Sequence, residues 1–529
     1  MTNGTGFVRL SQAFKIEFAS QLLEYATELD DLELAIDITL HHLRNDHHQL
    51  LELDRGEGSR LPSNEICDSL DFSRDKFALR GSRRILSVVT TAFSGSEKGQ
   101  PVKLTEKNIF GMQDRLHVPG SSTSPENNDK LFAILEANTT IGLLRGLQSF
   151  TQLVYELPRN RVRRDALFIP QVPLLIEDCP AFPHRAFMLD TSRHFFPVAG
   201  ESLILAFSSI YFTNARRNEL RKAECVSLVA SHPKLYKKAA YSQEETYSRS
   251  DVLHIQEYAN ARGISVLLEI DVPGHTASVA KVYPEHVACL DKDHNWPRYS
   301  AEPPTGQLRL DHEATQFASE VLESIAQLIN GPFLSTGGDE VNQRCYLEDQ
   351  RTLEEMKRRG NASLDALLSD FVNTVHDRLR VNGKTPVMLL NHELSLGKEV
   401  VVTVWISSAN VRAVADRGHR IIHAASEYLY LDCGAGGWIG NLPGGSNSWC
   451  DPFKSWQKVY SFDPFANVTE SQKTLILGGE ALLWTEQVDP TNLDSMAWPR
   501  AAAAAEVFWT GDSKSRSSKE ALPRLHDWR

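Results

Sequence analysis

The sequence predicts an α/β protein, namely a (β/α)8 TIM barrel with an altered second strand that follows a smaller α+β N-terminal domain. Two observations support this prediction. In the larger, C-terminal part of the chain, short apolar runs alternate with helical stretches, which is typical of a parallel sheet. Polar or aromatic residues follow most of these runs, as expected where a site lies at the carboxyl ends of barrel strands. With 529 residues, the chain is long enough for two or three domains.

The first domain is expected to cover residues 1–172. It differs in composition, because all nine tryptophans lie between Trp296 and Trp528. The closely spaced prolines of Ile169–Pro173 predict a linker, since proline breaks both helices and central strands. We therefore expect the catalytic barrel to occupy residues 173–529, with a truncated C-terminus. The elements expected in the first domain are two helices, Phe18–Leu53 and Thr139–Tyr155, and a strand, Arg84–Thr91.

Seven barrel strands are predicted from apolar runs, at Ala186–Asp190, Ser265–Asp271, Pro332–Thr336, Pro386–Asn391, Val400–Trp405, Arg420–Ala425 and Leu475–Trp484. Helices are expected between them, at Ser250–Arg262, His312–Asn330, Ser363–Val381, Asn410–Arg417 and Trp498–Phe508. An eight-stranded barrel needs one more strand. The wide gap between Asp190 and Ser265 is where it should lie, and Leu203–Phe212 is apolar enough to form it.

The most informative strand end is that of Pro332–Thr336, which is followed by Gly337, Gly338, Asp339 and Glu340. The glycines allow a ligand or another backbone to approach closely. Two carboxyl groups in one cavity can divide labour, because one stays ionised while the raised pKa of the other lets it donate a proton near neutral pH. A surface Asp-Glu turn is the alternative for this tetrapeptide alone.

Bulk composition excludes some classes of function. The formal net charge of −12 argues against a nucleic-acid partner, and no apolar run is long enough for a membrane span. The N-terminus does not read as a signal peptide, yet four Asn-x-Ser/Thr sequons suit a secreted chain. Cys289, Cys345, Cys433 and Cys450 flank the site region and are candidates for disulfides or for buried thiols.

Several motifs together resemble the β-N-acetylhexosaminidases of glycoside hydrolase family 20, in particular the fungal members. They run in family order over residues 183–509 and are Pro183–His194, Glu269–Thr276, Gly337–Glu340, Tyr430–Cys433, Gly478–Glu486 and Trp498–Glu506. The resemblance implies a retaining exo-glycosidase that releases terminal GlcNAc or GalNAc. In that mechanism the 2-acetamido group of the substrate is the nucleophile and forms an oxazolinium intermediate.

The resemblance also implies roles for individual residues. Glu340 would be the general acid and base, Asp339 would hold the acetamide N–H, and Tyr430 would orient the acetamide oxygen. The expected sugar-binding residues are Arg185, His275, Trp405, Asp432, Trp484 and Glu486. No cofactor or metal is expected, and the expected partner is an N-acetylhexosaminide, with a homodimer as the candidate assembly. The family implies a secreted or vacuolar location.

The chain departs from the family pattern in the second barrel strand and at the end of the fifth. Leu203–Cys225 lacks the family's His-Trp-His cluster and aspartate, and its Ala215–Glu224 part is charged and helix-prone. Thr385–His392 lacks a tryptophan and acids. We therefore expect weakened catalysis, with an inactive sugar-binding homologue as the alternative. A third class, a metallohydrolase that uses Asp271, His275 and Asp339, is disfavoured because no histidine cluster accompanies these acids.

Overall fold

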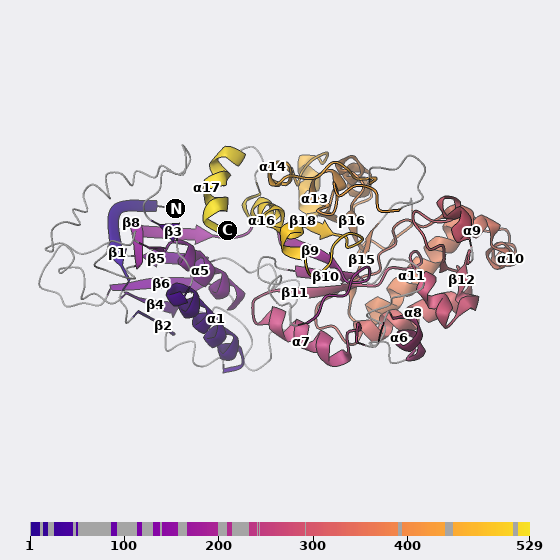
Figure 1. Cartoon of the computed structure of the whole chain (residues 1–529), viewed down its shortest axis with the longest axis horizontal. Coiled ribbons are helices and arrows are strands. Elements are labelled where there is room, and N and C mark those ends of the chain that lie inside the picture. The colour runs from indigo at the N-terminus through magenta and orange to yellow at the C-terminus, as the bar shows by residue number, and fades with distance from the viewer. Residues whose placement is uncertain are drawn as a thin grey trace, which may run out of the picture. The chain divides into compact units, whose positions relative to one another are not determined.

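Figure 1 shows the computed structural model of the chain, which divides into two compact units. Unit 1 comprises residues 1–180, 261–263 and 515–529, and unit 2 comprises residues 181–260 and 264–514. The structure describes residues 2–10, 14–18, 26–45, 49–50, 86–91, 114–118, 131–137, 140–156, 167–198, 209–213, 232–240, 242, 244–290, 292–389, 394–439, 448–511 and 517–528.

Unit 1 contains an eight-stranded mixed sheet with the order β2-β4-β6-β5-β8-β7-β3, in which β1 also pairs with β8. Helix α5 buries Leu143, Leu147 and Phe150, whose spacing places them on one helical face. Phe150 stacks on Phe14 with 5.6 Å between ring centroids. The elements are β1 (Thr2–Arg9), β2 (Lys15–Phe18), α1 (Ala26–Asn45), β3 (Gln49–Leu50), β4 (Leu86–Thr91), β5 (Asp114–Val118), β6 (Leu131–Ala137), α5 (Thr140–Gln152), β7 (Tyr155–Glu156), β8 (Leu167–Asp178) and α17 (Ser518–Trp528).

The prediction of a linker at Ile169–Pro173 is wrong, because these residues lie inside the twelve-residue strand β8. Their described partner is β1, whose register shifts around Gly6, opposite Val172. The described strands on the other edge of β8 do not pair with this stretch. Pairing with β7 ends at Phe168 of β8, and pairing with β5 begins at Leu174 of β8. A proline lacks the N–H of a ladder hydrogen bond, so it is tolerated where one edge of a strand has no partner.

Unit 2 contains the closed barrel, which confirms the predicted fold class. All its neighbouring strands are parallel, in the order β10-β11-β14-β15-β16-β17-β18-β9. Every residue of β16 is buried, as expected for a parallel strand that is covered on both faces. The strands are β9 (His184–Asp190), β10 (Ser209–Thr213), β11 (Ser265–Glu269), β14 (Phe333–Ser335), β15 (Thr385–Leu389), β16 (Val401–Val404), β17 (Arg420–His423) and β18 (Ile476–Leu483).

The strand that the sequence left unassigned is β10. It lies in the expected gap and overlaps the apolar run Leu203–Phe212. Its residues Ser209–Thr213 pair with Ala186–Asp190 of β9 on one side and with Ser265–Glu269 of β11 on the other. The charged tract Ala215–Glu224 that follows lies outside the described residues.

Several helices of unit 2 begin where a capping side chain satisfies one of their first N–H groups. Asp311 accepts a hydrogen bond from Ala314 N at the start of α8, and Ser363 accepts one from Ala366 N at the start of α11. All five expected barrel helices are present. The helices of this unit are α6 (Lys234–Ala239), α7 (Arg249–Asn260), α8 (His312–Ala326), α9 (Gln343–Glu348), α10 (Gln350–Arg358), α11 (Leu364–Val381), α12 (Val411–Asp416), α13 (Ser426–Leu429), α14 (Trp456–Tyr460), α15 (Leu493–Ala497) and α16 (Arg500–Thr510).

Two disulfides cross-link the loops of unit 2, Cys289–Cys345 and Cys433–Cys450, so these cysteines are not buried thiols. The first joins Cys289, which directly follows β12 (Val287–Ala288), to Cys345 of α9, and β12 pairs antiparallel with β13 (Gln307–Leu308). The remaining elements are short 3-10 helices, η4 (Ala277–Lys281), η5 (Pro284–His286), η6 (Asp293–Arg298), η7 (Ser408–Asn410) and η8 (Glu470–Leu475).

Candidate active site

The acid pair lies just beyond the carboxyl end of β14, in a turn that only glycine permits. Gly337 and Gly338 have φ of 58° and 102°. A Cβ on Gly337 would lie 2.2 Å from Asp271 Oδ1, and one on Gly338 would lie 2.4 Å from Met388 Cε. The sequence predicted close approach of a ligand or another backbone at these glycines, whereas the nearest atoms are those of the Asp271 and Met388 side chains.

Asp271 and Asp339 form a buried pair of acids that share a hydrogen bond. Burial and the neighbouring Asp339 raise the pKa of Asp271 well above its ordinary value. Gly338 N donates to Asp271 Oδ1 at 2.7 Å, so the other oxygen of this carboxyl group is left for Asp339. The hydrogen bond shared with Asp271 therefore fixes the orientation of the Asp339 carboxyl group.

His275 faces three acids of the site. Its Nε2 lies 3.5 Å from Glu340 Oε2, 3.8 Å from Asp271 Oδ2 and 3.9 Å from Asp339 Oδ2. Both His275 and Glu340 have a φ of 52°, an unfavourable left-handed backbone for residues other than glycine. Such strain persists only where the surrounding structure holds it, and it clusters at functional sites.

A cavity of about 260 Å³ opens beside these acids. Seven of the nine residues predicted for the site line it, and these are Asp339, Glu340, Trp405, Tyr430, Asp432, Trp484 and Glu486. The cavity is also lined by residues that the sequence did not single out, among them Trp296, Glu302, Trp438, Trp449 and Gln487. His275 reaches the cavity through its contact with Glu340.

One wall of the cavity is aromatic. Trp405 stacks on Tyr430 with 6.1 Å between centroids and 19° between ring planes, and Trp484 lies 6.4 Å from Tyr430. Tyr430 forms a β-bridge with Leu482 of β18, which fixes its backbone at the barrel mouth. Trp449 packs edge-on against both Trp405 and Tyr430, yet 61% of its surface is exposed. These rings offer apolar faces of the kind that pack against a sugar ring or a methyl group.

Another part of the cavity lining is polar. Burial, followed by the charge of Glu486, raises the pKa of Asp432 to about 8. Trp484 N donates to Asp432 Oδ1 at 3.4 Å. Asp432 and Glu486 place two carboxyl groups at the cavity, and their oxygens are suited to hydrogen bonds with several hydroxyl groups.

The structure does not bring Arg185 to the cavity, although the sequence predicted it to bind sugar. Arg185 is the second residue of β9, whereas Asp190 ends that strand, so the two lie at opposite ends of the barrel. Its Nη1 donates to Phe182 O at 2.5 Å, and its guanidinium lies over the Trp509 ring. Parallel strands share one carboxyl edge, and that edge is where the other predicted residues lie.

The arginine at the site is Arg193, which belongs to the motif Pro183–His194 but for which the sequence predicted no role. Its guanidinium lies 3.2 Å from Glu486, 3.3 Å from Glu302 and 4.9 Å from the centre of the Trp484 ring. An ion pair with Asp190 fixes the Arg193 guanidinium, with 3.0 Å between Asp190 Oδ2 and Arg193 Nη1. The signal that distinguishes the two arginines is their position: Arg193 comes after the end of its strand, and Arg185 comes at the start.

The residues Asp271, His275 and Asp339 also place three potential ligand atoms within 4.8 Å of one another. The hydrogen bonds that Asp271 forms with Asp339 and with Gly338 N already engage that carboxyl group. The arrangement suits a proton-sharing acid pair better than it suits a cation, which requires deprotonated ligands.

Comparison with known proteins gives consistent matches. A family model described as "Glycosyl hydrolase family 20, catalytic domain" matches residues 182–512. A beta-hexosaminidase of Arthroderma benhamiae is 33% identical over 417 residues, which are 75% of this chain and 67% of that protein. A chitooligosaccharidolytic beta-N-acetylglucosaminidase of Bombyx mori is 29% identical over 481 residues, or 86% of this chain and 78% of that protein.

Solved structures share the fold. An exo-β-N-acetylglucosaminidase from Vibrio harveyi, solved in complex with N-acetylglucosamine, gives a TM-score of 0.70 at 19% identity, over 99% of this chain and 76% of that chain. In the described part of the sequence, no helix has both the length and the apolar character needed to cross a membrane.

Proposed function

The chain belongs to glycosyl hydrolase family 20 and is a glycoside hydrolase of the β-N-acetylhexosaminidase type, and from this premise we propose that it is a retaining exo-enzyme whose substrate supplies the nucleophile. The observation that supports this mechanism is the fixed acid pair. Asp339 shares a hydrogen bond with Asp271, while Glu340 faces the cavity beside it. No separate carboxylate nucleophile is required when the acetamide oxygen of the sugar attacks.

In the first step, the acetamide carbonyl oxygen forms a bond to the anomeric carbon as the glycosidic C–O bond breaks. Glu340 gives its proton to the departing oxygen, so the leaving group departs as a neutral alcohol. The acetamide nitrogen gains positive charge in the oxazolinium ion, and the Asp339 carboxylate accepts its N–H hydrogen bond. The geometry favours this step, because holding an internal nucleophile in place is worth several powers of ten in rate.

In the second step, water attacks the anomeric carbon and gives a proton to the Glu340 carboxylate. The bond between the anomeric carbon and the acetamide oxygen breaks, so the acetamide and the protonated Glu340 are both regenerated. Two inversions give net retention at the anomeric carbon. Tyr430 is the group that aims the acetamide oxygen, and Trp405 and Trp484 exclude water from the acetamide methyl group.

The sugar is held by groups on the polar side of the cavity. Asp432 and Glu486 accept hydrogen bonds from the outer hydroxyl groups, and Arg193 donates to them with a guanidinium that Asp190 has already oriented. This assignment replaces Arg185 with Arg193 in the sugar-binding set. The cavity supports terminal GlcNAc or GalNAc, and Trp449 beside it supports an oligosaccharide as the aglycone.

The test of this function is the variant Glu340→Gln, assayed on an aryl N-acetyl-β-glucosaminide and on a chito-oligosaccharide. We expect kcat on the oligosaccharide to fall by ~10²–10⁴-fold, the usual contribution of a positioned acid or base. Binding of GlcNAc, measured by calorimetry, should change little. A wild-type chain that binds GlcNAc but hydrolyses neither substrate would instead identify the inactive sugar-binding homologue.

We also infer an oxidising location for the protein. The structure contains two disulfides. Disulfides persist in secreted proteins and are rare in cytosolic ones. Asn361 of the Asn-Ala-Ser sequon is exposed, which suits glycosylation. A gel shift on deglycosylation of the protein expressed in a fungal host tests this inference.

A further inference from the structure

The short strands β12 and β13 form a two-stranded ribbon that contacts both loops of the acid site. On one side, Leu308 N of β13 donates to Pro273 O at 2.8 Å, two residues before His275. On the other, Tyr346 Oη of α9 donates to Leu308 O at 2.6 Å. The main chain of a single ribbon residue therefore links the His275 loop to the helix that follows Glu340.

The side chain of the preceding ribbon residue, Gln307, makes the more direct link. Its Nε2 donates to Asn342 O at 2.9 Å, and its Oε1 accepts from Asn342 N at 3.0 Å. Gln307 is 4% exposed, so these two hydrogen bonds form out of competition with water. Asn342 itself caps α9, where its Oδ1 accepts from Cys345 N at 2.9 Å. One carboxamide thus fixes both main-chain polar groups of a residue two positions after Glu340.

Glu340 needs such support, because its φ of 52° is unfavourable for a residue with a side chain. Its Oε2 lies 3.5 Å from His275 Nε2, and the two residues belong to different loops. The distance between these loops therefore sets where the Glu340 carboxyl group points. The ribbon contacts the first loop at Pro273, two residues before His275, and the second loop at Asn342, two residues after Glu340.

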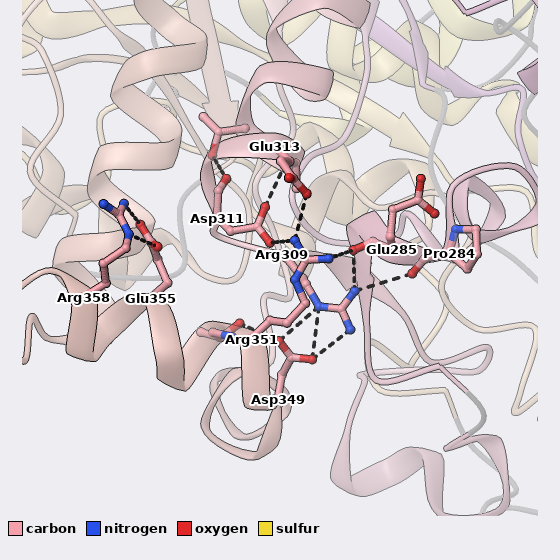
Figure 2. A network of polar contacts seen from close by, with 12 residues as sticks. Pro284, Glu285, Arg309, Asp311, Glu313, Asp349, Arg351, Glu355 and Arg358 are labelled. Carbon is pink, nitrogen blue, oxygen red and sulfur yellow. Dashed lines mark hydrogen bonds and ion pairs between the residues drawn. The ribbon is translucent and has the colours of Figure 1, made fainter.

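The ribbon is itself anchored on its outer side, as Figure 2 shows for Arg309. Arg309 follows β13 and forms an ion pair with Asp349 at 3.0 Å, and its Nη1 donates to Glu285 O at 2.5 Å. Arg351 donates to the same carbonyl oxygen and forms an ion pair with Asp311 at 2.8 Å. Asp311 and Asp349 are the N-caps of α8 and α10, so the ribbon is joined to the starts of two helices.

We propose that Gln307 is a positioning residue for the general acid, which holds Glu340 in line with the glycosidic oxygen through its two hydrogen bonds to Asn342. This inference rests on the proposed function. Its specific consequence is that losing the carboxamide impairs proton donation and leaves the acetamide attack unaffected, because Asp339 and Asp271 are fixed separately through Gly338 N.

The test uses two substrates that differ in their need for an acid. N,N′-diacetylchitobiose has an alcohol leaving group that must be protonated, whereas a dinitrophenyl N-acetyl-β-glucosaminide has a leaving group that departs as an anion. We expect Gln307→Met to lower kcat/KM on the chitobiose by ~10–100-fold, the effect of a small misplacement of a reacting group. On the dinitrophenyl substrate the loss should stay below about threefold.

A conservative variant gives an independent readout. In Gln307→Glu, the protonated carboxyl group both accepts from Asn342 N and donates to Asn342 O, as the carboxamide does. We expect chitobiose hydrolysis by this variant to approach that of the wild type at acidic pH. As the pH rises, chitobiose hydrolysis by the variant should decline at a lower pH than that of the wild type. The reason is that the introduced carboxyl group ionises and no longer donates to Asn342 O.

The matched control is Gln256→Met in α7. Gln256 is also buried, at 2% exposure, and its carboxamide bonds to the main chain at Val252, Leu328 and Asn330. We expect Gln256→Met to lower the midpoint of thermal unfolding, as Gln307→Met does. Its effect on kcat/KM should be the same for both substrates.

Equal losses on both substrates in Gln307→Met would overturn the proposal, as would a Gln307→Glu pH profile that matches the wild type. A wild-type chain that hydrolyses neither substrate would overturn the proposed function instead, so the two failures are distinguishable.

Discussion

At the scale of single residues, the surroundings of the carboxyl groups at the barrel mouth shift several of their pKa values. Burial and the neighbouring Asp339 raise the pKa of Asp271 well above its ordinary value, whereas Glu340 faces the cavity beside His275. Burial also raises the pKa of Glu269 and of Asp432, each to about 8. A site built from like acids can therefore assign a donor, an acceptor and a charged stabiliser without any change of residue type.

The two arginines of the segment after residue 183 give a matched prediction. Arg193→Lys should lower kcat/KM for N-acetyl-β-glucosaminides by ~10–100-fold, because a hydrogen bond to a charged group contributes about 1.5–3 kcal/mol and lysine lacks the planar donors. Arg185→Lys should leave kcat/KM unchanged, since Arg185 bonds to Phe182 O away from the cavity. Steady-state kinetics on folded fractions of both variants measure this difference, and the reverse order of losses would contradict the assignment.

Glu269 yields a prediction about pH and stability. Its pKa is raised from an ordinary value of 4.5 to about 8, mainly by burial and against the hydrogen bond from Ser335. Between these two values the folded state binds more protons than the unfolded state, so this group lowers stability as the pH rises from about 4.5 to 8. Glu269→Gln should therefore unfold at a higher urea concentration than the wild type at pH 8, with little difference near pH 4.5. Parallel pH dependences of the two urea midpoints would show that Glu269 does not titrate in this range.

At the scale of elements, the loops after the strands, and not the strands themselves, shape the cavity. The Cys433–Cys450 disulfide holds Trp449 next to the segment that carries Asp432. Asp451 adds hydrogen bonds from Gly434 N and Ser448 N, at 2.6 Å and 3.0 Å. An exposed tryptophan can therefore keep a fixed position against Trp405 and Tyr430 before any ligand binds.

Removal of this disulfide should affect both stability and substrate affinity. Cys433→Ala with Cys450→Ala is expected to lower the free energy of unfolding by about 2–4 kcal/mol, because the cross-link restricts the unfolded chain. KM for chito-oligosaccharides should rise by ~3–10-fold as Trp449 loses its fixed position, given the 0.5–1.5 kcal/mol of an aromatic contact. Chemical unfolding and steady-state kinetics measure the two effects. Trp449→Ala is the control, since it should raise KM to a similar extent with a smaller loss of stability.

At the scale of the whole molecule, the barrel closes through β10, a strand whose flanking sequence departs from the family pattern. The closure shows that the departure does not prevent the fold, because β10 pairs with both of its neighbours. Two predicted losses of supporting residues, in Ala215–Glu224 and at the end of Thr385–His392, fall largely outside the described residues. Weakened catalysis therefore stays a prediction.

This prediction is tested on the intact chain. If the missing histidine, tryptophan and acid groups support Glu340 and the acetamide pocket, kcat/KM on an aryl N-acetyl-β-glucosaminide should be lower by ~10–100-fold than that of a relative that contains them. The size of this effect is that of removing the groups that orient the ligands of a metal site. The beta-hexosaminidase of Arthroderma benhamiae is a suitable reference, provided that its sequence contains these segments. Equal catalytic efficiency would refute the weakening and would show that other residues supply this support.

The sequence by itself determined seven of the eight barrel strands, the α/β architecture, the acid pair and, through the family motifs, seven of the cavity-lining residues, because each depends on local periodicity or on a short motif. It failed at Ile169–Pro173, where prolines are tolerated because none of the described strands pairs with one edge of β8 there. Only the tertiary structure replaced Arg185 with Arg193, raised the pKa of Asp271 by burying it against Asp339, and linked Gln307 to Asn342. These features join residues that are distant in the chain, and they depend on strand direction, burial and loop contacts that arise only when the barrel closes.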